Sequence, residues 1–182
     1  MHTTSSLLTE LDALPFRWEV AGTLAAPVEA VAALLLAVAE GRVGDDNLLL
    51  LARASAARQG AMTVVTGPGA DAYRAELAGP VEPVDIQVDR ARSRVAVQSW
   101  YAGVHTATAC PAGTLVTHRV HRVVPDHPGF ADGIAELGLR ARMSRDLQQV
   151  LEVIADRLGC RRSTLLTRSG PAEGEIPSGE AT

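Results

Sequence analysis

The chain has 182 residues, a net charge of −4 and an apolar fraction of 47%, values typical of one ordinary globular domain. All 17 basic residues are arginine and lysine is absent, which excludes a Schiff-base lysine and the lysine of a phosphate-binding loop. The negative charge also argues against nucleic-acid binding, which depends on attraction to phosphates.

Cysteine usage and apolar patterning indicate the cytoplasm. Cys110 and Cys160 are the only two cysteines, too few for a disulfide framework or a four-cysteine zinc site. The N-terminal residues lack the basic and then apolar pattern of a secretory signal. The longest apolar run, residues 30–39, is about half as long as a membrane span requires. We therefore expect a cytoplasmic protein without a membrane span.

The first third of the chain predicts one strand and two short helices. Residues 1–14 are polar and are expected to be loose. Residues 16–24 alternate between apolar and polar, which predicts a half-buried strand with Trp18 on its apolar side. A helix is expected to start at Pro27 and to stop at Gly41, and a second, shorter helix is expected over residues 48–58.

The remainder of the chain predicts a meander of strands and one long helix. Apolar residues recur every three or four positions from Leu139 to Leu158, and Ile134 and Leu137 extend this helix backwards. The domain is expected to span residues 15–160, followed by a disordered tail over 161–182. Six β-rich segments separated by turn residues precede the helix, over residues 62–66, 73–78, 84–88, 94–101, 104–110 and 114–124.

Three segments resemble the SRPBCC superfamily, which includes START domains, the birch-pollen allergen family and polyketide cyclase/dehydrase proteins. They are Val20-Ala-Gly-Thr-Leu-Ala-Ala-Pro27-Val-Glu29-Ala-Val31, Gly113-Thr114-Leu-Val116, and the arginine-rich amphipathic run from Arg140 to Leu147. The resemblance covers about residues 16–159. It implies an α+β helix-grip fold, in which a curved antiparallel sheet of about seven strands wraps the long C-terminal helix. The resemblance also implies two short helices after strand one and an apolar cavity between sheet and helix.

Strand parity selects the residues that would face this cavity. His118 shares the parity of Val116 and Val120, so it is expected to point inward. An inward imidazole could move a proton or polarise a carbonyl group, or it could be a hydrogen-bonded core residue. Tyr101 could orient a ligand through its hydroxyl group, or simply fill the core. The catalytic candidates are His118 and Tyr101, and the ligand-binding candidates are Trp18, Tyr73, Tyr101, His118, Arg122, Leu139 and Met143.

Arg122 is included because it shares the parity of His118 and could meet an acidic ligand at the cavity rim, provided that it has a partner. No metal site is expected, because His118 and His121 lie an odd number of residues apart and point to opposite faces of a strand. Residues 67–72 fit the G-x-G-x-x-A form of a dinucleotide-binding turn, but too few residues follow for the required helix. A hairpin loop is the preferred interpretation, and no cofactor is expected.

The resemblance thus implies a domain that binds a hydrophobic or polyketide-like small molecule, and whether it also assists cyclisation or dehydration is left open. The alternatives are a carrier or regulator that uses the same cavity without catalysis, and a partner-binding module. The expected partner is a hydrophobic small molecule, with no nucleic acid and no membrane span. The sequence leaves open whether the chain forms a homodimer.

Overall fold

The fold centres on one large antiparallel sheet. The computed structural model describes residues 6–44, 46–53, 62–67, 69–77, 83–123, 134–163 and 165–170. In this part of the chain nine strands form the sheet in the order β2-β3-β4-β5-β6-β7-β8-β1-β9. The strands are β1 (Trp18–Leu24), β2 (Gly41–Arg42), β3 (Met62–Thr66), β4 (Ala72–Leu77), β5 (Val84–Asp89), β6 (Arg94–Gln98), β7 (Tyr101–Cys110), β8 (Gly113–Val123) and β9 (Leu166–Ser169).

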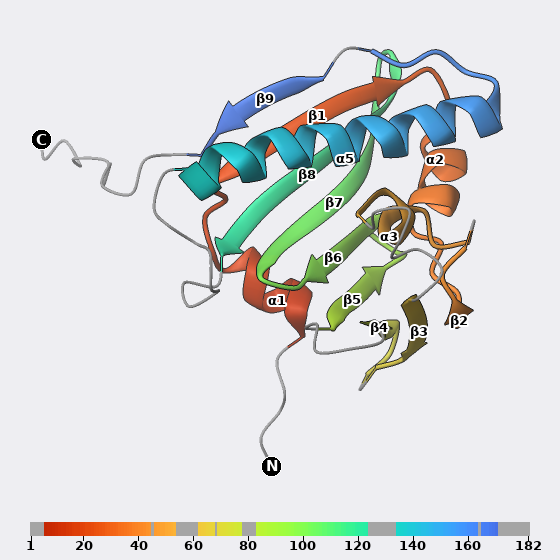
Figure 1. Cartoon of the computed structure of the whole chain (residues 1–182). Coiled ribbons are helices and arrows are strands. Elements are labelled where there is room, and N and C mark those ends of the chain that lie inside the picture. The colour runs from red at the N-terminus through yellow and green to blue at the C-terminus, as the bar shows by residue number, and fades with distance from the viewer. Residues whose placement is uncertain are drawn as a thin grey trace, which may run out of the picture.

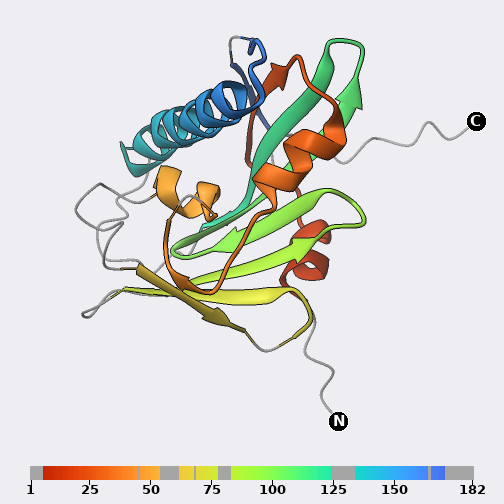
Figure 2. The same ribbon diagram turned by 90° about the vertical axis from the view of Figure 1, so that its right-hand side faces the viewer.

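Helices lie on both sides of this sheet. They are α1 (Leu7–Asp12), α2 (Val28–Leu35), α3 (Leu48–Arg53) and α5 (Ile134–Leu158). Figure 1 shows α5 running across β1, β8 and β7, and Figure 2 shows the sheet curving beneath α5 and α3, with α1 on the opposite side. The predicted helix-grip architecture is therefore confirmed. The sheet has two strands more than expected, namely the short edge strands β2 and β9. They form by backbone pairing, which no apolar pattern in the sequence predicts.

The main core fills the concave side of the sheet. Alternating residues of the central strands and the apolar stripe of α5 form one buried cluster, since each element has one apolar face that must be covered. The stripe spans the helix at three- and four-residue spacing, as the sequence predicts. Its members are at most 2% exposed, and they are Leu139, Met143, Leu147, Val150, Leu151 and Ile154.

The N-terminal segment that was expected to be loose contains α1, which docks on the convex face. Ser6 caps the helix by accepting a hydrogen bond from the Thr9 amide at 3.2 Å. Leu8 and Leu11 are buried in a second, smaller apolar cluster with side chains of β6 and β7. A helix of six residues is not stable alone, so it forms here because the sheet supplies its apolar partner.

The expected disordered tail likewise contains structure. Strand β9 pairs with β1 through the register Trp18↔Ser169 to Ala21↔Leu166. All four of its side chains are exposed, so main-chain hydrogen bonds hold it. Sequence patterns report side-chain burial, and this strand buries none of its side chains.

Several predicted boundaries also shift. The expected strand over residues 94–101 ends at Gln98, because Ser99 and Trp100 form a turn and Tyr101 begins β7. The predicted second helix, residues 48–58, is described only as far as Arg53. Strands β3 and β4 pair as a hairpin, and the Gly67 amide donates to the Ala72 carbonyl at 2.8 Å where the two strands are joined. This agrees with the preferred interpretation of that segment.

Arg94 connects α1 to the β5–β6 hairpin, and its loss should destabilise the protein in a pH-dependent way. Its guanidinium lies 2.8 Å from Asp12 of α1 and 3.3 Å from Asp89. Desolvation alone would raise the pKa of Asp89, but the Arg92 amide and the Arg94 guanidinium outweigh it and hold the pKa below its ordinary value. We expect Arg94→Gln to lower the free energy of unfolding at pH 7 by about 1–2 kcal/mol, measured by urea denaturation.

The pH trend follows from the lowered pKa of Asp89. A carboxylate of this kind adds stability above its unfolded pKa of about 3.9 and loses it as the pH falls through the lower folded pKa. The difference between wild type and Arg94→Gln should therefore shrink in acid. Arg92→Gln is the matched control, because the Arg92 side chain is 73% exposed and that of Arg94 only 17%. Equal losses for the two variants, or a pH-independent difference, would contradict this account.

Candidate functional site

The centre of the concave face carries two histidines side by side. His118 on β8 lies directly opposite Val20 on β1 and opposite His105 on β7, and His105 in turn lies opposite Val95 on β6. Residues that pair directly across antiparallel strands share one face of the sheet. Both histidines are buried, at 1% and 3% exposure, within an otherwise apolar row. The inward orientation predicted for His118 is confirmed.

The two imidazoles are stacked, and a phenol lies beside them. The ring centroids of His105 and His118 are 3.9 Å apart, with 17° between the ring planes. Tyr101 is 1% exposed, and its ring centroid lies 6.5 Å from that of His118. Tyr101 also makes an edge-to-face contact with Trp100, at 4.9 Å between centroids. Three polar rings are therefore gathered at one place on the apolar concave face.

Gly103 makes this arrangement possible. It lies between Tyr101 and His105 on the concave side of β7, opposite Val120. A Cβ atom at this position would lie 2.8 Å from His118 Nε2 and 2.7 Å from the Arg119 carbonyl oxygen. The edge of the His118 ring therefore rests directly over the glycine. A residue with a side chain here would displace the ring from its stacked position.

Helix α5 covers the concave face with apolar side chains. Leu139 and Met143 are at most 2% exposed and belong to the same cluster as Trp18 and Tyr101. Asp146 lies between Met143 and Val150 on the buried side of this helix. One of its carboxylate oxygens is 3.6 Å from the Arg142 guanidinium. Four predicted ligand-binding residues, Trp18, Tyr101, Leu139 and Met143, thus share one buried cluster on the face that carries His118.

Tyr73 is on the same face but far from this centre. It lies on β4 opposite Ile86 of β5, is half-buried, and packs at the margin of the core. Three strands separate β4 from β8 in the sheet. At about 4.8 Å between neighbouring strands, Tyr73 and His118 are roughly 19 Å apart along the sheet. The structure therefore does not bring Tyr73 together with His118 and Tyr101.

Arg122 lies on the opposite face from the one predicted. Val120 pairs with Gly103 and Arg122 pairs with Ala102, so β8 contains one extra residue at a β-bulge. The bulge reverses the parity of the strand, and Val123 takes the inward position opposite Tyr101. The Arg122 guanidinium donates to the Gln98 side chain and lies 3.9 Å from Glu10 of α1, on the convex side.

The concave side of the described structure is closely packed where α3 meets the sheet. A void of about 10 Å³ lies there, close to the least space that one water molecule needs and far too small for a ligand. A ligand-sized cavity beside His118 stays a prediction. The void is lined by Ala37, Val38, Asn47, Leu49, Leu50, Ile86 and Val97.

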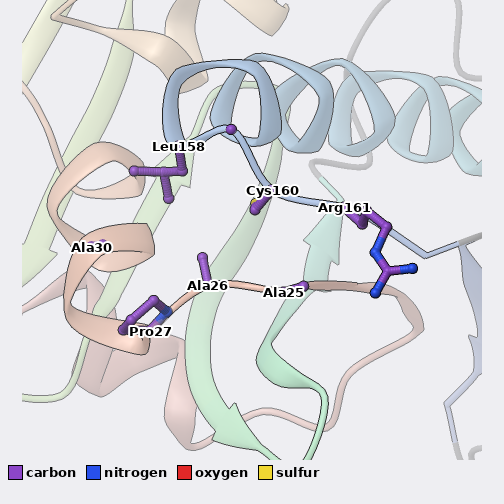
Figure 3. A pocket seen from close by; sticks show the side chains of 8 residues that line it. Ala25, Ala26, Pro27, Ala30, Leu158, Cys160 and Arg161 are labelled. Atoms are coloured by element: carbon purple, nitrogen blue, oxygen red, sulfur yellow. The ribbon is translucent and has the colours of Figure 1, made fainter.

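Two larger pockets lie elsewhere. One, of about 440 Å³, lies on the convex side between α1 and strands β4 and β5, and Tyr73 is the one predicted site residue that lines it. The other, of about 420 Å³, lies where the turn after β1 meets the end of α5. Figure 3 shows its small side chains and the Arg161 side chain directed away from α2. It is lined by Ala25, Ala26, Pro27, Ala30, Leu158, Gly159, Cys160 and Arg161.

Neither clusters of metal-binding side chains nor membrane-spanning helices are found in the described ranges. These ranges contain no group of three or more His, Cys, Asp or Glu side chains placed to hold a metal ion. They also contain no helix of the length and apolarity needed to cross a membrane.

Known structures share this fold. A protein from Nitrosospira multiformis has a TM-score of 0.50 at 13% identity, over 78% of this chain and 99% of that one. The chain therefore shares its overall fold with this protein. The Zhui aromatase/cyclase from Streptomyces sp. R1128 gives a TM-score of 0.47 at 18% identity, over 79% and 96% of the two chains. Protein TTHA0849 from Thermus thermophilus gives 0.49 at 17% identity, over 77% and 96%.

Comparison by sequence finds no match, either among protein-family models or among curated proteins. The predicted SRPBCC resemblance is thus confirmed as a likeness of fold. The helix-grip arrangement that it implied is the one described above, with the long C-terminal helix across the concave face.

Sequence reasoning overlooked His105 as a site residue. It shares the parity of Tyr101 on β7, which would have placed it on the inward face. Its pairing with His118 depends on the register between β7 and β8, which the hairpin turn at Pro111 and Ala112 sets. Strand parity is therefore enough to predict that both histidines point inward. Only the register between β7 and β8 shows that they lie opposite each other.

Proposed function

We propose that the chain binds a hydrophobic or polyketide-like small molecule against the concave face of its sheet, with His118 and Tyr101 as the groups that orient it. The burial of polar rings together on an otherwise apolar face supports this proposal. Apolar pockets with a few convergent polar groups are the usual form of small-molecule sites.

The two groups differ in the chemistry that they can supply. An imidazole can take or give a proton near neutral pH, whereas a phenol mainly donates a hydrogen bond. If the ligand reacts, His118 would transfer the proton that cyclisation or dehydration requires, and Tyr101 would hold a ligand oxygen. The enclosed face would contribute by holding a flexible chain in one conformation.

A carrier without catalysis is the alternative within the same site. The near-complete burial of His118 and Tyr101 favours it, because both side chains are part of the packed core and would hold a ligand in place without turnover. The two functions differ in one observable property. A carrier releases its ligand unchanged, whereas a cyclase or dehydratase releases a product that has lost water or gained a ring.

Binding is tested with a polycyclic phenol and two conservative variants. Native mass spectrometry of the full chain should show alizarin (1,2-dihydroxyanthraquinone) bound in a 1:1 complex. We expect His118→Gln and Tyr101→Phe each to weaken its binding by about three- to tenfold, as the loss of one hydrogen bond predicts. Absorbance titration measures the dissociation constants.

His121→Gln is the matched control for this experiment. His121 is the extra residue of the bulge, is half-exposed, and its Nδ1 lies 3.0 Å from the Leu14 carbonyl oxygen, near α1. Its replacement should leave alizarin affinity unchanged. Equal losses in all three variants would place the ligand elsewhere, and failure of the wild-type chain to bind the dye would overturn the proposed function for polycyclic phenols.

A further inference from the structure

His105 is the group that the proposed function does not yet use. It is 3% exposed, stacks on His118 at 3.9 Å between centroids, and sits opposite it in the strand register. Register, stacking and the clearance over Gly103 all hold the two rings in one arrangement. Neither ring can move or change its charge without affecting the other.

We propose that His105 and His118 act as one proton-binding unit, and that the ligand they serve carries an acidic oxygen such as a phenol or an enol. The inference has two halves, the coupled pair and its ligand, and only the ligand half rests on the proposed function. Two imidazolium rings at this separation, away from water, would repel each other strongly. Burial among apolar side chains makes the first proton costly, and the repulsion makes the second proton costlier still, so the two rings titrate as a coupled pair.

Among the described residues, the ionisable groups around the pair belong to β1, β7, β8 and α5. Its neighbours across the strands, Val20 and Val95, are apolar. Tyr101 is the ionisable group of β7 on this face. On the described part of α5, the Asp146 carboxylate lies on the buried side, 3.6 Å from the Arg142 guanidinium. Glu19 of β1 and Arg119 of β8 contact each other at 2.6 Å on the other face of the sheet.

The chemistry of the pair selects the ligand. A neutral imidazole pair can accept the proton of a phenol or enol, so that the ligand O–H bond breaks and an imidazole N–H bond forms. The ligand is then bound as an anion beside a singly charged pair, and no other reactant is needed. Either ring can accept this proton, so the pair offers the ligand oxygen the nitrogens of two imidazoles where a single histidine offers those of one.

The pair is tested first without any ligand. Proton–nitrogen correlation spectra of the ¹⁵N-labelled full chain follow each histidine ring as the pH changes. We expect one of the two rings to titrate at least about one pH unit, or tenfold in proton affinity, below the other. In His105→Gln, His118 should take up its proton in a single step with a changed midpoint. Independent titrations with the same midpoints in wild type and variant would overturn the proposal.

The ligand half is tested through the colour of alizarin, which changes when its phenol ionises. The dye bound to wild-type protein should ionise at a pH about one unit lower than free dye, a tenfold effect. His105→Gln and His118→Gln should still bind the dye but lose this shift, whereas His121→Gln should keep it. Dye that binds without a shift overturns the inference and leaves the proposed function intact. Dye that does not bind overturns the proposed function for polycyclic phenols and the ligand half with it. The titration of the pair still decides the other half.

His105→Phe provides a second variant in case His105→Gln does not fold. It keeps a flat ring stacked against His118 and removes the titratable nitrogens. A shift retained in His105→Phe would show that stacking, and not the ring nitrogens of His105, is responsible, and would overturn the proposal.

Discussion

Gly113→Ala is expected to lower the free energy of unfolding by at least about 3 kcal/mol, measured by urea denaturation. Gly113 begins β8 with a φ of +121°, a conformation that residues with side chains rarely adopt. An added Cβ would also overlap the Leu24 carbonyl oxygen and come within 2.9 Å of the Ala26 nitrogen. Both contacts are with backbone atoms, which cannot turn aside. The neighbouring Thr114 donates to the Ala26 carbonyl at 2.7 Å, so the hairpin is held against this turn.

Gly41→Ala separates the two causes of this loss. Gly41 has a similar positive φ, +102°, but a Cβ added there would meet no atom within 4 Å. Its replacement should therefore cost only the backbone strain, about 1–2 kcal/mol. The excess cost at Gly113 measures how tightly the β7–β8 hairpin packs against the turn between β1 and α2. Equal losses at the two positions would show that the hairpin does not need this close approach.

Leu151→Ala is expected to cost about 2–5 kcal/mol, because it removes a fully buried side chain from the contact between α5 and β1. Leu151 Cδ1 lies only 2.6 Å from where a Cβ on Gly22 would stand. The small residue on β1 thus accommodates the large residue on the helix. Thermal or urea denaturation of the variant measures the loss directly.

A double-mutant cycle tests whether these two residues act as a pair. Gly22→Ala alone should destabilise the protein by overpacking, since its new methyl group meets Leu151 and, at 3.0 Å, Leu165. In the double variant the methyl group fills part of the space left by Leu151. The combined loss should therefore be smaller than the sum of the two single losses by at least about 0.5 kcal/mol. Strict additivity would contradict the close approach of α5 to β1.

Patterns of side-chain burial were sufficient to predict most of this architecture. The period-two alternation in β1 and β8 and the three- and four-residue spacing in α5 reflect burial of one face, and the structure buries those faces. His118 was placed correctly for that reason. Tyr101 also lies on the concave face, as its parity predicts, although the turn at Ser99 and Trp100 places it on β7 and not on β6. Elements held by main-chain hydrogen bonds, such as β9, produce no pattern of apolar residues in the sequence.

Arg122 shows where strand parity ceases to apply. A single extra residue in β8 reverses the orientation of every side chain beyond it, and no local residue pattern marks that insertion. The same limit applies to α1, whose six residues become helical only on the convex face of β6 and β7. These features depend on contacts between segments far apart in the chain.

The composition of the chain determined one point without any structure. With lysine absent, proton transfer near neutral pH depends on histidine, tyrosine or an acid in an unusual environment. The tertiary structure decided which of these residues meet. The register between β7 and β8 sets His105 against His118, the bulge turns Arg122 away, and the order of the strands leaves Tyr73 at a distance. Local sequence encodes which face a side chain takes, whereas its neighbours on that face depend on pairings that close long loops of chain.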